Sequence, residues 1–168
     1  MANVPQTAPR EVALRFDSGS ELRTAMLEVI QGARHALCWY TRDLEPPVTD
    51  DPAVLEALRS LSLKGRGSSI RVLLQDPTRA VRDGHRLIEM ARRLSSVYAL
   101  RRVHPEDLAY PAAFLVNDHG GFLFRTFGDR YEGEGHTWHP ARCNQLLRFF
   151  NEVWERADVP IELRALSL

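Results

Sequence analysis

Apolar residues along the chain follow two spacings that alternate, which predicts a succession of helices and strands. Between residues 18 and 32 they recur every three or four positions, as on one face of an amphipathic helix. Ser18 and Glu21 open this stretch with the spacing of a capping box, and Gly32 is a suitable stop. The compact apolar run 35–41 that follows is typical of a strand buried on both faces.

The same order of helix and strand occurs twice more. A predicted helix over 52–65 precedes a strand over 68–76, and a predicted helix over 83–94 precedes a strand over 97–103. Because a helix separates the first two strands, we expect these to be parallel neighbours joined by a right-handed crossover.

The rest of the chain predicts a hairpin and a final helix. Residues 113–118 and 121–126 have strand character and flank a His-Gly-Gly turn, which is typical of an antiparallel hairpin. Residues 132–140 predict a loop, and residues 141–157 a strongly amphipathic helix. We expect residues 1–10 to form a disordered tail and residues 11–168 a single α/β domain.

Composition and charge narrow the classes of function. No apolar run approaches the roughly 20 residues that cross a bilayer, and the first residues lack the apolar core of a secretory signal. We therefore expect a cytoplasmic protein without a membrane partner. The 22 basic and 22 acidic residues balance, so the basic footprint of a nucleic-acid-binding protein is absent and nucleic acid is an unlikely partner.

The order of the predicted elements resembles one half of the phospholipase D superfamily fold. The segments that carry the resemblance are residues 21–41, 54–76, 114–126 and 146–157. The resemblance implies a mixed, mostly parallel sheet with helices on both faces. It also implies a homodimer, since single-copy members of that superfamily pair two halves about their active-site faces.

The same resemblance indicates that the catalytic residues are missing. The superfamily pattern HxKxxxxD supplies a His that attacks phosphorus and a Lys that holds the phosphate oxygens. With Asp118 on the Asp of the pattern, Pro111 stands in the place of the His and Ala113 in the place of the Lys. Neither side chain can carry nucleophilic catalysis of this type, so we expect no such activity and no cofactor. Asp118 itself is expected to accept backbone hydrogen bonds at a turn.

Two arginines occupy further positions of that pattern. Arg125 and Thr126 fall on its Gly-Ser pair, and Arg130 falls on its Asn. Guanidinium groups bind phosphate or carboxylate through two hydrogen bonds at once, so the loss of the nucleophile leaves room for a small-anion site.

The strand ends provide the remaining candidates, because ligands in open α/β sheets bind beyond the carboxyl ends of parallel strands. The candidate ligand-binding residues follow the first two core strands or belong to the hairpin and the loop after it: Arg42, Asp43, Gln75, Asp76, Arg125, Arg130, Glu132 and Glu134. The alternative is that strand ends are polar simply because they reach the surface.

A weaker candidate is a metal site near the end of the predicted loop. Glu134, His136, His139 and Cys143 include two histidines three residues apart followed by a cysteine, which is a feasible ligand spacing for zinc. The pattern is short, and the glycines on either side of Glu134 favour a loop instead. We therefore expect no metal.

Four phrases, RFDSGSELR, WYTRDLE, LLQDP and RYEGEG, are similar to an uncharacterised bacterial domain that is found after GNAT-type acetyltransferase domains. The acetyl-coenzyme A loop of those enzymes does not occur in this chain. The function predicted is therefore a non-catalytic phospholipase D-like domain that serves as a binding or assembly module. Two alternatives stay open: a small-anion or nucleotide sensor, and a hydrolase or transferase that uses the Arg, Asp and Glu cluster.

Overall fold

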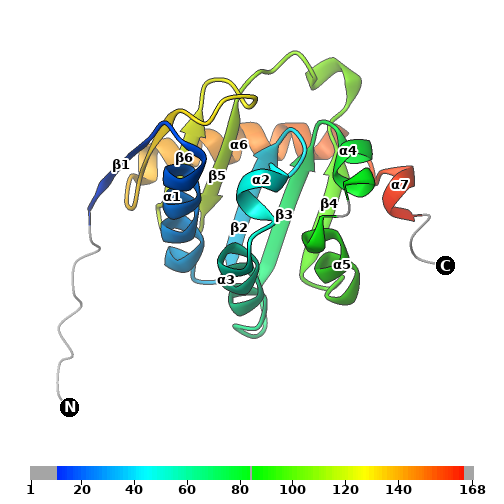
Figure 1. Cartoon of the computed structure of the whole chain (residues 1–168), viewed down its shortest axis with the longest axis horizontal. Coiled ribbons are helices and arrows are strands. Elements are labelled where there is room, and N and C mark those ends of the chain that lie inside the picture. The colour runs from blue at the N-terminus through cyan, green and yellow to red at the C-terminus, as the bar shows by residue number, and fades with distance from the viewer. Residues whose placement is uncertain (1–10, 84, 165–168) are drawn as a thin grey trace.

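The computed structural model describes residues 11–83 and 85–164, and a single mixed sheet of seven strands runs through them (Figure 1). The predicted tail, residues 1–10, lies outside the described part. In the order in which they neighbour one another, the strands are β1 (Ala13–Phe16), β7 (Gly133–His136), β6 (Phe122–Arg125), β5 (Ala113–Asn117), β2 (Ala36–Thr41), β3 (Ser69–Leu74) and β4 (Tyr98–Arg102).

The predicted α/β fold with a mixed sheet is confirmed, but the sheet is less parallel than expected. Strands β2 and β3 are parallel neighbours, as predicted, and β4 pairs parallel to β3. The hairpin β5–β6 is antiparallel and pairs with β2. Beyond it, β7 and β1 add two further antiparallel pairings. The prediction of a mostly parallel sheet is therefore correct only for the half that contains β2, β3 and β4.

Strand β7 corrects the prediction of a loop over residues 132–140. Its sequence, Gly-Glu-Gly-His, has almost no β propensity, so pattern alone favours a loop. A Cβ atom at Gly133 or Gly135 would collide with a backbone carbonyl oxygen of β6. The glycines thus allow two strands to approach closely, and this tertiary requirement outweighs the local preference for a loop.

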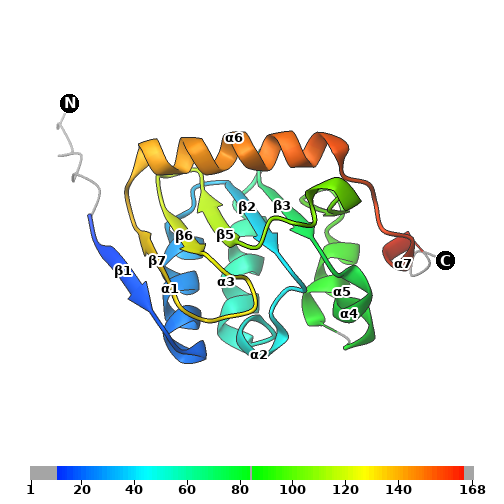
Figure 2. The same cartoon turned by 90° about the horizontal axis from the view of Figure 1, so that it is seen from above.

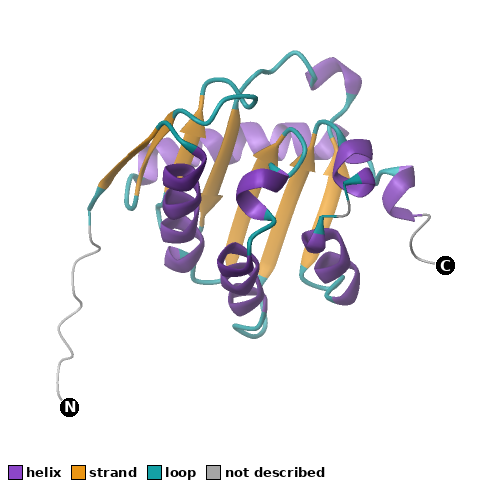
Figure 3. Cartoon of the chain, viewed as in Figure 1, coloured by secondary structure: helices purple, strands orange, loops and turns teal. Residues whose placement is uncertain are grey.

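Helices cover both faces of the sheet (Figures 2 and 3). One face carries α1, α3 and α5, and the long α6 crosses the other face nearly from edge to edge. The helices are α1 (Gly19–Gly32), α2 (Pro46–Thr49), α3 (Pro52–Ser62), α4 (Pro77–Arg82), α5 (Arg86–Arg93), the 3-10 turn η1 (Pro105–Asp107), α6 (Pro140–Arg156) and α7 (Ile161–Arg164). None of the described helices combines the length and apolarity needed to cross a bilayer.

The core has two layers because the sheet is buried on both faces. Between the sheet and α1 and α3, Leu22 and Trp39 are almost fully buried. Between the sheet and α6, Tyr40 stacks on Phe114 with ring centroids 5.3 Å apart, and Phe150 of α6 packs beside them. This explains why the sequence of β2 is a continuous apolar run rather than an alternating one.

Candidate functional site

The phospholipase D-like hairpin places its key positions at opposite ends. Ala113 of β5 and Arg125 of β6 are direct partners at one end. Asp118 lies at the other end, where its two carboxylate oxygens accept the backbone N–H groups of Arg34 (2.7 Å) and His35 (2.9 Å). Asp118 therefore holds the turn between α1 and β2, in agreement with the backbone-accepting role expected of it.

Arg125 lies inside the protein, with only 5% of its surface exposed. Its guanidinium forms an ion pair with the equally buried carboxylate of Glu45. It also donates to the backbone oxygens of Gly128 (3.2 Å) and Arg130 (2.8 Å). Burial lowers the pKa of Arg125 to about 10, so the side chain stays protonated at neutral pH.

The space between Arg125, Ala113 and helix α1 is almost filled. The cavity that Glu45 and Arg125 line there has a volume of about 10 Å³, and the rest of its wall is apolar. Such a volume holds at most about one water molecule. In the position where the resemblance implies a bound phosphate, this chain has a buried ion pair between Arg125 and Glu45 and almost no free space.

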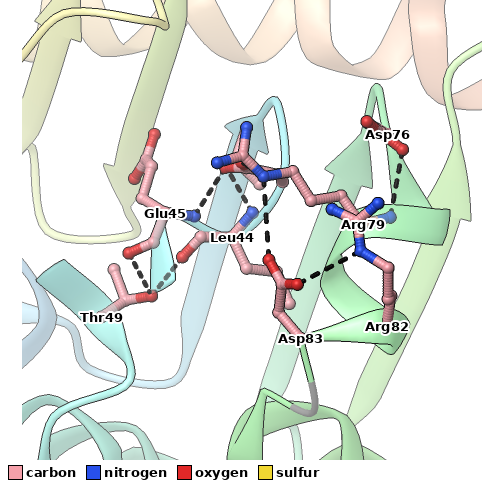
Figure 4. Close-up of polar contacts among 9 residues, drawn as sticks. Leu44, Glu45, Thr49, Asp76, Arg79, Arg82 and Asp83 are labelled. Atoms are coloured by element: carbon pink, nitrogen blue, oxygen red, sulfur yellow. Dashed lines mark hydrogen bonds and ion pairs between the residues drawn. The ribbon is translucent and has the colours of Figure 1, made fainter. Parts of the chain in front are cut away.

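Glu45 reaches Arg125 from an unusual loop between β2 and α2. Leu44 and Glu45 both have left-handed backbone conformations, with φ of 68° and 50°, which cost non-glycine residues about 1 kcal/mol or more each. Asp43 accepts the N–H of Glu45 at 3.0 Å, and the hydroxyl of Thr49 donates to the carbonyl oxygen of Leu44 (Figure 4). His85 contacts this Thr49 hydroxyl through Nε2 at 2.8 Å, and burial lowers the pKa of His85.

The charges at the carboxyl ends of β2 and β3 are also paired with one another. Arg79 of α4 is the common partner, since its Nε lies 3.2 Å from the carboxylate of Asp43 and 3.7 Å from that of Asp83 (Figure 4). Asp76 accepts the backbone N–H of Arg79 at 3.1 Å and so caps α4. Arg82 contacts Asp83 at 3.3 Å. This end of the sheet is a salt-bridge network within the described residues.

The other predicted site residues lie apart from this network. Gln75 donates to the backbone oxygen of Tyr110 at 2.8 Å. The guanidinium of Arg130 lies over the ring of Phe127, 5.0 Å from its centroid, and the side chain of Arg42 is exposed. Of the three arginines expected to converge, only Arg125 points into the interior.

Two predicted carboxylates belong to a different surface. Glu132 and Glu134 line an open cleft of about 580 Å³ together with residues of β1, α1, β6 and α6, among them Arg15 and Arg142. The sequence therefore predicted residues of two separate places as one site. It missed Glu45 and Arg79, although Glu45 ends the polar phrase TRDLE that follows the first core strand.

The weak metal candidates do not form a ligand set. The rings of His136 and His139 lie 6.1 Å apart, and their Nδ1 atoms accept backbone N–H groups. Cys143 is buried, which raises the pKa of its thiol to about 11. Across residues 11–83 and 85–164, no three His, Cys, Asp or Glu side chains are close enough together to hold a metal ion.

Two solved structures are similar in fold. The phospholipase D family member Nuc from Salmonella typhimurium has a TM-score of 0.61 and 13% identity, with 89% of this chain and 97% of that chain covered. TrmBL2, an archaeal chromatin protein that binds DNA, has a TM-score of 0.60 and 15% identity, with 92% of this chain covered. This chain spans 56% of the length of TrmBL2.

At these identities the likeness extends to the fold alone. It bears out the expected phospholipase D-like α/β fold. A comparison with curated proteins found no match. Residues 18–166 match the model of a family described as a domain of unknown function, DUF7931, and the chain belongs to that family.

Proposed function

We propose that this chain is a non-catalytic phospholipase D-like domain that acts as a binding or assembly module. The observation that carries the proposal is the buried ion pair between Arg125 and Glu45, which fills the position beside Ala113 where the hairpin needs an open phosphate site. Pro111 and Ala113 add neither a nucleophile nor a cation there. The proposal includes a cytoplasmic location and the setting after a GNAT-type acetyltransferase domain in bacteria.

The two alternatives have less support. A hydrolase or transferase needs carboxylates that are free to act on a substrate, whereas Asp43 is paired with Arg79 and Asp76 caps α4. A small-anion sensor needs converging cations, and Arg42 and Arg130 are exposed while Arg125 is buried.

The purified protein should show no hydrolysis of phosphodiester lipids, of DNA or of a chromogenic diester above background, because neither Pro111 nor Ala113 can attack phosphorus or hold a phosphate oxygen. The measurement is product release over hours at high enzyme concentration. Arg42→Ala and Arg130→Ala serve as variants, since both side chains are exposed and neither change should prevent folding. Turnover that copurifies with the wild type and is lost in either variant would refute the non-catalytic function.

The assembly part of the proposal predicts a dimer at micromolar concentration. The loop between β6 and β7, which begins directly after Arg125, exposes Phe127 (43%) and Tyr131 (41%). Removing both rings, as Phe127→Ser with Tyr131→Ser, should shift the protein to monomer in sedimentation velocity. The matched control is Leu63→Ser, because Leu63 is 60% exposed on the turn after α3. A wild-type monomer across the whole concentration range would remove the assembly proposal.

A further inference from the structure

Three turns meet at the end of the sheet opposite to Arg125: those between α1 and β2, α3 and β3, and β5 and β6. The ammonium of Lys64, on the second turn, donates to the backbone oxygen of Ala33 on the first at 2.7 Å. Asp118, on the third turn, holds the N–H groups of Arg34 and His35 on the first. These contacts bring residues that are up to 84 positions apart in the chain into one continuous surface.

The positive charge that is left unpaired in the described protein is concentrated on this surface. Ten arginines form ion pairs with carboxylates, and four others lie over aromatic rings. Six described basic side chains have neither kind of partner: Arg15, Arg34, Arg42, Lys64, Arg66 and Arg148. Half of them, Arg34, Lys64 and Arg66, lie on the first two turns.

The one carboxylate on these three turns does not pair with those side chains. Both oxygens of Asp118 are engaged by the backbone N–H groups of Arg34 and His35. Three cations and one carboxylate leave the surface with a formal charge of about +2. A chain whose total formal charge is zero therefore carries a local basic surface.

An exposed aromatic ring borders the same surface. Trp138 packs on Gly120 of the turn between β5 and β6, so closely that a Cβ atom there would lie 2.9 Å from the indole. Trp138 remains 37% exposed, whereas Trp39 and Trp154 are buried in the two core layers. Proteins that bind single strands combine a cationic track for the phosphates with aromatic rings on which bases stack.

We propose that this surface, the basic stripe formed by Arg34, His35, Lys64, Arg66, His119 and Trp138, binds single-stranded nucleic acid. The cations of the first two turns contact successive phosphates, and Trp138 stacks on a base. Gly65 and Gly67 leave open space above the turn after α3, so a phosphate backbone can approach it closely. The stripe lies at the turn end of the hairpin, whereas Arg125 pairs with Ala113 at the other end, so the stripe does not depend on the state of the Arg125 site.

The test is fluorescence anisotropy with a labelled thymidine oligonucleotide of roughly 12 nucleotides, at about 50 and 200 mM salt. The triple variant Arg34→Ala, Lys64→Ala, Arg66→Ala should bind at least tenfold more weakly. Its slope of log affinity against log salt should be flatter by about 2, since each phosphate contact on a single strand contributes about 0.7. Trp138→Leu should lower the affinity roughly tenfold and leave its salt dependence unchanged, because the ring carries no charge. Trp138→Phe should retain most of the affinity, since a ring remains for stacking.

The matched control is Arg82→Ala, Arg148→Ala, Arg156→Ala, which removes the same number of charges from exposed positions away from the stripe. The oligonucleotide affinity of this control should stay within about twofold of that of the wild type. Circular dichroism melts establish that each variant is folded. The proposal is overturned by absence of binding at low salt, by equal losses in the two triple variants, or by an unchanged affinity of Trp138→Leu. Sedimentation and diester hydrolysis are measured separately, so this result and that of the proposed function are distinguishable.

Discussion

Replacing Glu45 by alanine should lower the free energy of unfolding by about 3–5 kcal/mol, because a buried guanidinium then loses its counter-charge. Arg125 is 5% exposed, and its guanidinium otherwise donates hydrogen bonds to two neutral backbone oxygens. Neither can replace a carboxylate in a space that holds about one water molecule. Urea unfolding followed by fluorescence measures the change, with the midpoint compared at constant m-value.

Two controls distinguish the effect of the unpaired buried charge on stability from the effect of lost packing. The double variant Glu45→Leu with Arg125→Met removes both charges and keeps apolar volume, so it should be closer to the wild type than Glu45→Ala. Arg102→Ala breaks an exposed pair with Asp158 and should cost no more than about 1 kcal/mol. If Glu45→Ala costs as little as Arg102→Ala, Arg125 is accessible to solvent or to an external anion, and the hairpin site is not closed.

Replacing Gly135 by alanine should destabilise the fold by about 3 kcal/mol or more, since overpacking against backbone cannot be relieved by a rotamer change. The added Cβ would meet the carbonyl oxygen of Phe122 and the side chain of Leu123, both in β6. Strand β7 would have to move away from β6, and β1 is attached to the sheet only through β7. Urea unfolding and amide exchange of the β1 and β7 residues measure the effect.

Gly19→Ala is the matched control for that substitution. A Cβ at Gly19 would make ordinary contacts, the nearest at 3.5 Å to the ring of Tyr131. Gly19 begins helix α1, where alanine is favoured over glycine by up to about 1 kcal/mol, so this variant should be neutral or more stable. A Gly135→Ala protein with the unfolding midpoint of the wild type would show that β6 and β7 are not closely packed there.

The overall charge of this chain does not describe the local charge of its surface. The balance of 22 basic and 22 acidic residues argued against nucleic acid. Ion pairs such as Arg86–Asp50 and Arg156–Asp107 neutralise charge locally, and the unpaired cations that remain are not evenly spread. The binding of a charged ligand depends on the electrostatic potential at the binding surface rather than on the net charge of the whole chain. The charge of the basic stripe is therefore the relevant quantity for nucleic-acid binding.

The sequence by itself determined the elements that depend on local pattern. The periodic apolar positions before and after Gly32 predicted α1 and β2, and the two later repeats predicted α3 with β3 and α5 with β4. The hairpin and α6 followed in the same way. With the phospholipase D-like resemblance, the sequence also predicted that Pro111 and Ala113 stand where that superfamily has its His and Lys, and neither side chain supports that chemistry.

Tertiary structure decided everything that depends on contacts between distant segments. Glu45 and Arg125 are 80 positions apart, and only the left-handed turn at Leu44 brings their side chains together. Strand β7 pairs with β6 because Gly133 and Gly135 leave room for the β6 backbone, although glycine has little strand propensity. The basic stripe joins turns that no local pattern connects. Periodicity reports on which face of an element is buried, whereas the partner of that face is set by packing of the whole chain.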